Sequence, residues 1–128
     1  MFNHKVMIVD TNKKFLGDLE ETLTFSGYDT IVTQDPYSAL AIASREKPQA
    51  ILLDLKMPGK SGFQLAHELK SSFELQHIPI IAMTEFFKDG YKNLMDMCGI
   101  KKCLKKPFNP LDVITEIEAV LEQKSATI

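Results

Sequence analysis

Four polar side chains whose types could do chemistry together stand at the ends of mostly apolar runs of the sequence. They are Asp10, Asp54, Thr84 and Lys106. Two carboxylates, a hydroxyl group and an ammonium group suit a divalent cation held beside a phosphoryl group, because the cation prefers oxygen ligands and the phosphoryl group carries spread negative charge. This chemistry requires a fold in which the ends of these four apolar runs lie close together.

The apolar runs predict five strands that alternate with helices. The runs span residues 6–9, 30–33, 50–53, 78–83 and 101–103. The first, third and fourth runs are nearly all apolar, which is typical of strands covered on both faces. Between the runs, apolar residues recur at helical spacing, as they do at Leu16, Leu19 and Leu23. The order is therefore (βα)5.

Local signals support these elements and place the polar residues at one edge. Asp35-Pro36 predicts the start of a helix, as does Asn109-Pro110. Glycines stand at element edges, at Gly27, Gly62 and Gly99. Strands joined by single helices are parallel. In such a sheet, ligands bind beyond the carboxyl ends of the strands, which is where the four polar residues fall.

Composition indicates one soluble domain. The chain has 128 residues, with 15 basic and 17 acidic side chains and a formal net charge of −2. No global field points to nucleic acid or to a membrane surface, and no apolar run approaches the roughly 20 residues of a membrane span. Cys98 and Cys103 form neither a disulfide framework nor a zinc-binding spacing. We expect a cytoplasmic protein that binds neither nucleic acid nor membrane directly.

With these residues in place, the sequence resembles a response-regulator receiver domain of two-component signalling, in the CheY-like superfamily. The strongest signature is the run from Asp54 to Pro58, DLKMP, followed by Gly62. The rest of the pattern comes from Asp10, Thr84 and the Lys106-Pro107-Phe108 triplet. The resemblance covers the chain from Lys5 to about Gln123. It implies a flavodoxin-like α/β fold, a three-layer (βα)5 sandwich with a parallel sheet of strand order 2-1-3-4-5.

The resemblance also implies the role of each residue. Asp54 would accept a phosphoryl group from a histidine kinase or a histidine phosphotransfer protein, so the domain is a signalling phosphoacceptor rather than a classical enzyme. A carboxylate can attack phosphorus to give an acyl phosphate. Mg²⁺ would be held by Asp10, Asp54 and the backbone carbonyl of Lys56. Thr84 and Lys106 would bind the phosphoryl group, and the bond before the proline that follows would be cis.

Three positions depart from the family pattern. Thr11 stands where receivers usually carry a second acid that contacts the metal, so the pocket has a formal charge of −1 instead of −2. One charge pair at about 4 Å is worth roughly 4 kcal/mol at an effective dielectric of about 20, and dehydration offsets much of it, so we expect Mg²⁺ to bind about 10- to 100-fold more weakly than in a typical receiver. Glu85 replaces a small residue, and Cys103 replaces the aromatic switch residue of the fifth strand.

The signalling face that the resemblance implies includes the stretch from Phe87 to Met97, Cys103 and the helix from Pro110 to Gln123. Phe86, Phe87 and Tyr91 either form an exposed anchor for a partner or pack against the fourth strand. Because cysteine cannot act as an inward-swinging ring, we expect this face to change little on phosphorylation.

Several alternatives stay open or are disfavoured. Asp10 could also cap the helix that follows it. The same fold could serve as a pseudo-receiver, a docking module that works without phosphorylation. A flavin carrier would need a phosphate loop unlike DTNKKF, and an aspartate-nucleophile phosphatase would need an acid at Lys56. The single domain would span 1–128 with a core of about 5–123 and a tail at 124–128, and its output would be a downstream protein or an output domain beyond this sequence.

Overall fold

The computed structural model describes residues 4–126, which form one five-stranded parallel sheet with five helices. The strands follow the order β2-β1-β3-β4-β5. The elements along the chain are β1 (Lys5–Val9), α1 (Lys13–Phe25), β2 (Asp29–Thr33), α2 (Ala39–Glu46), β3 (Ala50–Asp54), α3 (Gly62–Ser71), β4 (Ile80–Thr84), α4 (Tyr91–Met97), β5 (Ile100–Lys105) and α5 (Pro110–Ala126). The predicted α/β fold class and strand order are confirmed.

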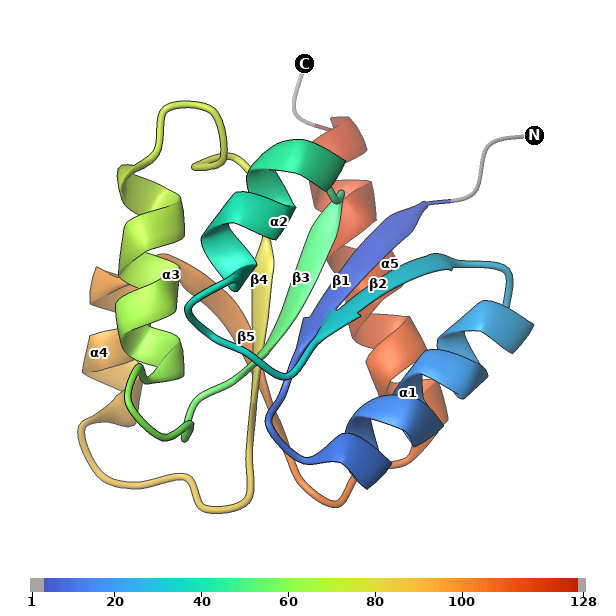
Figure 1. Cartoon of the computed structure of the whole chain (residues 1–128), viewed down its shortest axis with the longest axis horizontal. Helices are drawn as coiled ribbons and strands as arrows, with labels where there is room; N and C mark the ends of the chain where they lie inside the picture. Colours follow the sequence, from blue (N-terminus) through green and yellow to red (C-terminus); the bar gives the residue numbers. More distant parts are fainter. Residues whose placement is uncertain (1–3, 127–128) are drawn as a thin grey trace.

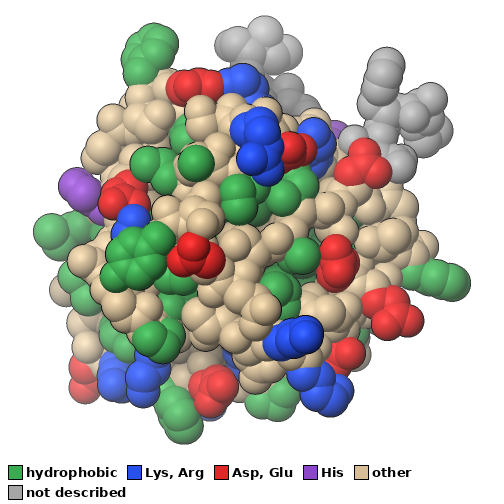
Figure 2. Space-filling model, viewed as in Figure 1, with side chains coloured by type: hydrophobic (Ala, Val, Ile, Leu, Met, Phe, Trp, Pro, Cys, Tyr) green, Lys and Arg blue, Asp and Glu red, His purple; other side chains and the backbone are tan. Residues whose placement is uncertain are grey.

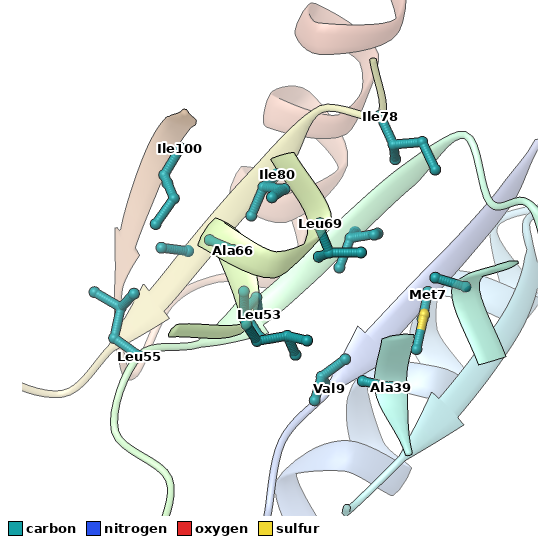
Figure 3. Packing of buried hydrophobic residues seen from close by; sticks show 14 of the residues in the cluster. Met7, Val9, Ala39, Leu53, Leu55, Ala66, Leu69, Ile78, Ile80 and Ile100 are labelled. Atoms are coloured by element: carbon teal, nitrogen blue, oxygen red, sulfur yellow. The ribbon is translucent and has the colours of Figure 1, made fainter. Parts of the chain in front are cut away.

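The sheet is the middle of three layers, with helices on both faces (Figure 1). Helices α1 and α5 cover one face, where a cluster around Ile8, Leu52 and Ile117 is buried. Helices α2, α3 and α4 cover the other face. Figure 3 shows part of that second cluster. Strand side chains such as Met7, Val9, Leu53 and Ile80 pack there against the helix residues Ala39, Ala66 and Leu69. Burial on both faces explains why β1, β3 and β4 read as nearly continuous apolar runs.

The strands all point toward one edge of the molecule, where the loops after β1, β3, β4 and β5 lie close to one another (Figure 1). Figure 2 shows acidic and basic side chains interspersed over the viewed face, in keeping with a net charge of −2. No helix within residues 4–126 is long and apolar enough to cross a membrane.

Some predicted boundaries shift for local reasons. Asp35-Pro36 does not begin a helix: its carboxylate accepts from the Tyr37 N–H and the Ser38 hydroxyl, and the turn so formed delays α2 until Ala39. Strand β4 begins at Ile80 instead of residue 78, after a proline that has no N–H for a sheet hydrogen bond. Helix α5 runs to Ala126, so residues 124–126 of the predicted tail are helical, and residues 127 and 128 lie outside the described residues.

Candidate functional site

The carboxyl edge of the sheet holds a small polar cluster inside an otherwise apolar core. Among the side chains that the structure describes, the polar or charged ones that are buried are Asp10, Asp54, Thr84 and Lys106. Their exposed fractions are 0%, 8%, 4% and 9%. Burying charged groups is costly unless they are paired. The four residues singled out by strand-end position therefore come together.

Asp10 makes two separate contacts through its two carboxylate oxygens. Oδ1 accepts the N–H of Asn12 at 2.9 Å, and Oδ2 accepts from the Lys106 ammonium at 2.5 Å. The cap of α1 is Asn12, whose side chain accepts the N–H of Phe15 at 3.0 Å. The alternative in which Asp10 caps this helix is wrong, because its carboxylate accepts from the turn before the helix and from the lysine.

Lys106 is held mainly by Asp10 and only loosely by Asp54. Its Nζ lies 2.5 Å from the Asp10 carboxylate but 3.7 Å from Oδ1 of Asp54. The Lys106 N–H donates to the Thr84 carbonyl at 2.7 Å, which fastens the β5–α5 loop to the end of β4. The peptide bond between Lys106 and Pro107 is cis, as expected.

Asp54 ends β3 at the mouth of a cleft of about 110 Å³, lined by Asp54, Lys56, Thr84, Glu85, Phe86, Lys88 and Tyr91. Burial raises the pKa of the Asp54 carboxyl to about 6, and the charge of Asp10 adds to this effect. The Lys106 ammonium and the N–H of Lys56 oppose the rise. Of the three charged members of the cluster, Asp54 is thus the one that lines this cleft, and its nearest ionic partner, Lys106, is 3.7 Å away.

Thr84 is buried beside Asp54, but its hydroxyl is already engaged. The hydroxyl donates to the carbonyl of Phe86 at 3.1 Å and accepts the Phe86 N–H at 3.3 Å. These two bonds close a turn at the start of the β4–α4 loop. In this conformation the hydrogen bonds of the hydroxyl are made to the backbone of Phe86.

The β3–α3 loop is folded tightly back over the end of β3. The Gly62 N–H donates to the Leu55 carbonyl at 2.9 Å, and a Cβ at Gly62 would lie 2.3 Å from the Asp54 carbonyl oxygen. Only glycine allows this approach. A reciprocal capping box of Ser61 and Gln64 then starts α3. This packing fixes the position of Lys56 beside Asp54.

The three departures from the family pattern lie around the cluster. Thr11 is half-buried next to Asp10, and its carbonyl accepts from the side chain of Gln34. Glu85 is exposed in the β4–α4 loop. Cys103 lies on β5 opposite Ala82 and is half-buried against the core, and it is not among the residues that line the Asp54 cleft. The switch role of Cys103 stays a prediction.

The expectation that some of the aromatic residues near α4 are exposed is confirmed, whereas their packing against β4 stays a prediction. Phe86 and Phe87 are exposed by 67% and 52%. The Tyr91 ring instead packs edge-to-face with Phe63 and with Phe87, at centroid distances of 5.1 and 5.8 Å.

Sequence reasoning missed one neighbour of the cluster. Phe15, which the sequence analysis did not single out, lies with its ring centroid 4.0 Å from the Lys106 ammonium. Phe15 also lines a pocket of about 590 Å³ between α1 and the β5–α5 loop, together with Asn12, Asp18, Leu19, Thr22, Glu85, Phe86, Lys106, Pro107, Phe108 and Pro110. Phe15 lies three residues after the cap residue Asn12, on the turn that follows Asp10, and this spacing could have indicated its contact with the site.

The donor set at this edge suits a hard cation. Asp10 and Asp54 offer carboxylate oxygens within 3.7 Å of the Lys106 ammonium, and Lys56 lines the same cleft as Asp54. Mg²⁺ takes one or two carboxylates and keeps several waters. The described residues contain no group of three or more His, Cys, Asp or Glu side chains that could hold a metal ion. The site therefore fits Mg²⁺ but not a cation that needs a full protein cage.

Comparison with known proteins agrees with this geometry. The family model described as the response regulator receiver domain matches residues 6–118. The polar-differentiation response regulator DivK of Brucella anthropi is 34% identical over 116 residues, which cover 91% of this chain and 94% of DivK.

Solved structures share the fold. The chemotaxis protein CheY4 of Vibrio cholerae superposes with a TM-score of 0.89 at 26% identity, covering 93% of this chain and 99% of that one. The receiver domain of the sensor histidine kinase PA1611 from Pseudomonas aeruginosa, solved with a magnesium ion in its active site cleft, gives a TM-score of 0.86 at 23% identity, covering 94% and 99%. The family model covers most of the chain, and its strand-end residues meet in one buried cluster, so the chain belongs to the response regulator receiver domain family of two-component signalling.

Proposed function

We propose that this receiver domain accepts a phosphoryl group on Asp54 from a histidine kinase or a histidine phosphotransfer protein. The observation that carries the proposal is the buried cluster, in which Asp10, Thr84 and Lys106 surround a carboxylate that opens to a cleft. Phosphoryl transfer depends mostly on positioning and on electrostatic stabilisation, and this cluster offers both.

In the transfer step, a carboxylate oxygen of Asp54 attacks the phosphorus atom of a phosphohistidine. A P–O bond forms while the P–N bond to the donor imidazole breaks, and the imidazole leaves with the electron pair. Lys106 lies 3.7 Å from Asp54 and can neutralise charge on the phosphoryl oxygens. The Thr84 hydroxyl can donate to the same oxygens once it leaves Phe86.

Asp10, Asp54 and the Lys56 carbonyl would hold Mg²⁺. When bound there, Mg²⁺ supplies positive charge that neutralises the transferred phosphoryl group. Asp10 would bind the metal with a carboxylate whose charge is already neutralised by Lys106 at 2.5 Å, and Thr11 provides no second acid. Both features favour weak binding of Mg²⁺.

The phosphodonor has a suitable surface on which to dock. The pocket of about 590 Å³ lies between α1 and the β5–α5 loop, and Lys106, Glu85 and Phe86 belong to its lining. Glu85 and Phe86 also line the cleft of Asp54, so the two hollows share a wall. A helix that fills the larger pocket would stand beside the phosphoacceptor, and the exposed residues Phe86 and Phe87 offer an anchor for a downstream protein.

A second candidate function is a pseudo-receiver that binds partners without phosphorylation. Specific observations favour it: Lys106 is committed to Asp10, the Thr84 hydroxyl is committed to Phe86, and Thr11 replaces an acid. In this function the same surfaces would serve as constitutive contacts.

Labelling with a small phosphodonor separates the two functions. The purified chain is incubated with phosphoramidate or acetyl phosphate, with and without Mg²⁺, and intact mass spectrometry follows the gain of one phosphoryl group. We expect Mg²⁺-dependent, hydroxylamine-sensitive labelling that Asp54→Asn abolishes and that Asp29→Asn, at an exposed acid on β2, leaves intact. Labelling that persists in Asp54→Asn would refute the assignment of the acceptor. No labelling of the wild-type chain under any condition would favour the pseudo-receiver.

A further inference from the structure

The Lys106 ammonium has a third neighbour besides the two carboxylates. The centroid of the Phe15 ring lies 4.0 Å from Nζ, well within the distance at which a cation is attracted to an aromatic face. Lys106 is 9% exposed, so little water competes for its charge. Attraction of this kind grows when the pair is desolvated.

The Phe15 ring is fixed from two sides. Its N–H donates to the cap residue Asn12, which sets the first turn of α1. Phe108 packs edge-to-face on the ring, with centroids 5.6 Å apart and planes at 84°. The ring therefore follows a hydrogen-bonded turn that also includes Asp10.

Asp10 and Phe15 thus act on Lys106 from the same segment of the chain, while Asp54 lies farther away. The Nζ atom is 2.5 Å from Asp10 and 3.7 Å from Asp54. A lysine that leaves Asp10 for a phosphoryl group on Asp54 moves away from the chain segment that also carries the ring. The ring therefore stabilises one of two positions of the ammonium, and such a differential contact shifts the equilibrium between them.

We propose that Phe15 is a positioning residue, which holds the Lys106 ammonium against Asp10 and thereby weakens the binding of Mg²⁺ at that carboxylate. Its link to Mg²⁺ rests on the proposed function, whereas the contact between ring and ammonium does not. An aliphatic side chain of similar volume would keep the packing against Phe108 but would lack the charge distribution of the ring. An aromatic replacement would keep both.

The contact itself is measured without metal or phosphodonor. In a ¹H–¹³C NMR spectrum of the lysine ε-methylene groups, one signal that is lost in Lys106→Met should show a ring-current shift in the wild-type chain. Phe15→Leu should return that signal to the ordinary lysine position, and Phe15→Tyr should retain the shift. Phe25→Leu, at a 95% exposed ring on the same helix, should change nothing. A Lys106 signal without a ring-current shift in the wild-type chain would overturn the proposal.

The consequence is measured by calorimetric titration with Mg²⁺. Loss of a cation–π contact of this kind is worth roughly a fivefold change in equilibrium, so Phe15→Leu should tighten the Kd about fivefold, while Phe15→Tyr and Phe25→Leu stay within about twofold of wild type. An equal change in the Leu and Tyr variants would assign Phe15 to packing and overturn the proposal. An unchanged Kd in Phe15→Leu would overturn it too.

A chain that binds no Mg²⁺ at all would refute the metal part of the proposed function but would still allow a test of Phe15. A double-mutant cycle of Phe15→Leu and Lys106→Met in urea unfolding should then show a coupling of about fivefold in the folding equilibrium. Additive effects of the two substitutions would overturn the proposal on their own.

Discussion

Thr11 is the position at which one substitution should restore the acidic pair that the family pattern leads us to expect. Thr11 is half-buried and directly follows Asp10, whose carboxylate is fully buried. With Asp54 and Lys106, the buried charges sum to −1. Thr11→Asp would make that sum −2 and would place a third carboxylate beside the proposed metal position.

The magnitude follows from charge and distance. A unit charge pair at about 4 Å contributes roughly 4 kcal/mol at an effective dielectric of about 20. Dehydration of the new carboxylate and its repulsion from Asp10 and Asp54 offset part of this. We expect a net gain of roughly 1.4–2.8 kcal/mol, a Kd for Mg²⁺ that is about 10- to 100-fold lower. The same repulsion should destabilise the metal-free variant.

The assay is calorimetric titration of Mg²⁺ into wild-type, Thr11→Asp and Thr11→Asn chains. The Asn variant has nearly the shape of the Asp variant without its charge, so it should bind like wild type. Thermal unfolding gives a second measure, because saturating Mg²⁺ stabilises the tighter binder by RT ln(1 + [Mg²⁺]/Kd). An unchanged Kd in the Asp variant, or an equal gain in the Asn variant, would refute the electrostatic argument.

Three further predictions concern stability, measured by urea unfolding. Lys106→Met should cost about 3–5 kcal/mol because it leaves Asp10 buried and unpaired, and adding Asp10→Asn should recover most of that loss. Gly62→Ala should lower the free energy of unfolding by at least about 2 kcal/mol, because the new Cβ would clash with the Asp54 carbonyl. Gly17→Ala, in α1, should raise it by about 1 kcal/mol, because no atom lies within 4 Å of the new Cβ. Burial raises the pKa of Asp54 from 3.8 to about 6, so between these pH values the folded chain binds more protons than the unfolded chain. The free energy of unfolding should therefore fall by up to about 3 kcal/mol as pH rises through this window. Asp54→Asn should remove this dependence on pH.

The sequence predicted the fold well because the pattern of apolar runs and helical spacing recurs along the whole chain. Apolar runs that are buried on both faces mark β1, β3 and β4 unambiguously. Strand β5 was predicted as residues 101–103 but spans Ile100–Lys105, since an edge strand keeps exposed lysines that hide its length. Alternation of strands and helices predicts a parallel sheet, whereas the strand order came from the family resemblance. The start of α2 was predicted wrongly because Asp35 satisfies a turn of its own.

The sequence predicted which residues form the site, because their positions at the ends of parallel strands determine that they meet. Parallel strands in register bring their carboxyl ends together, so Asp10, Asp54 and Thr84 had to meet. The contacts among these residues depend on loops instead. The preference of Lys106 for Asp10 over Asp54, and the cation–π contact with Phe15, arise from the turn between β1 and α1, which residue spacing does not determine.

The same loops bear on how a signal could leave the site. The expectation of a surface that changes little rested on Cys103, which has no ring to swing inward, and that prediction stands untested. The structure adds a second difference between states, because the Thr84 hydroxyl cannot bond a phosphoryl group while it holds both the carbonyl and the N–H of Phe86. Any state with Thr84 on the phosphoryl group must open this turn. Phe87 adjoins the turn and packs on Tyr91, so a movement there has a route to α4 that does not require a ring at Cys103.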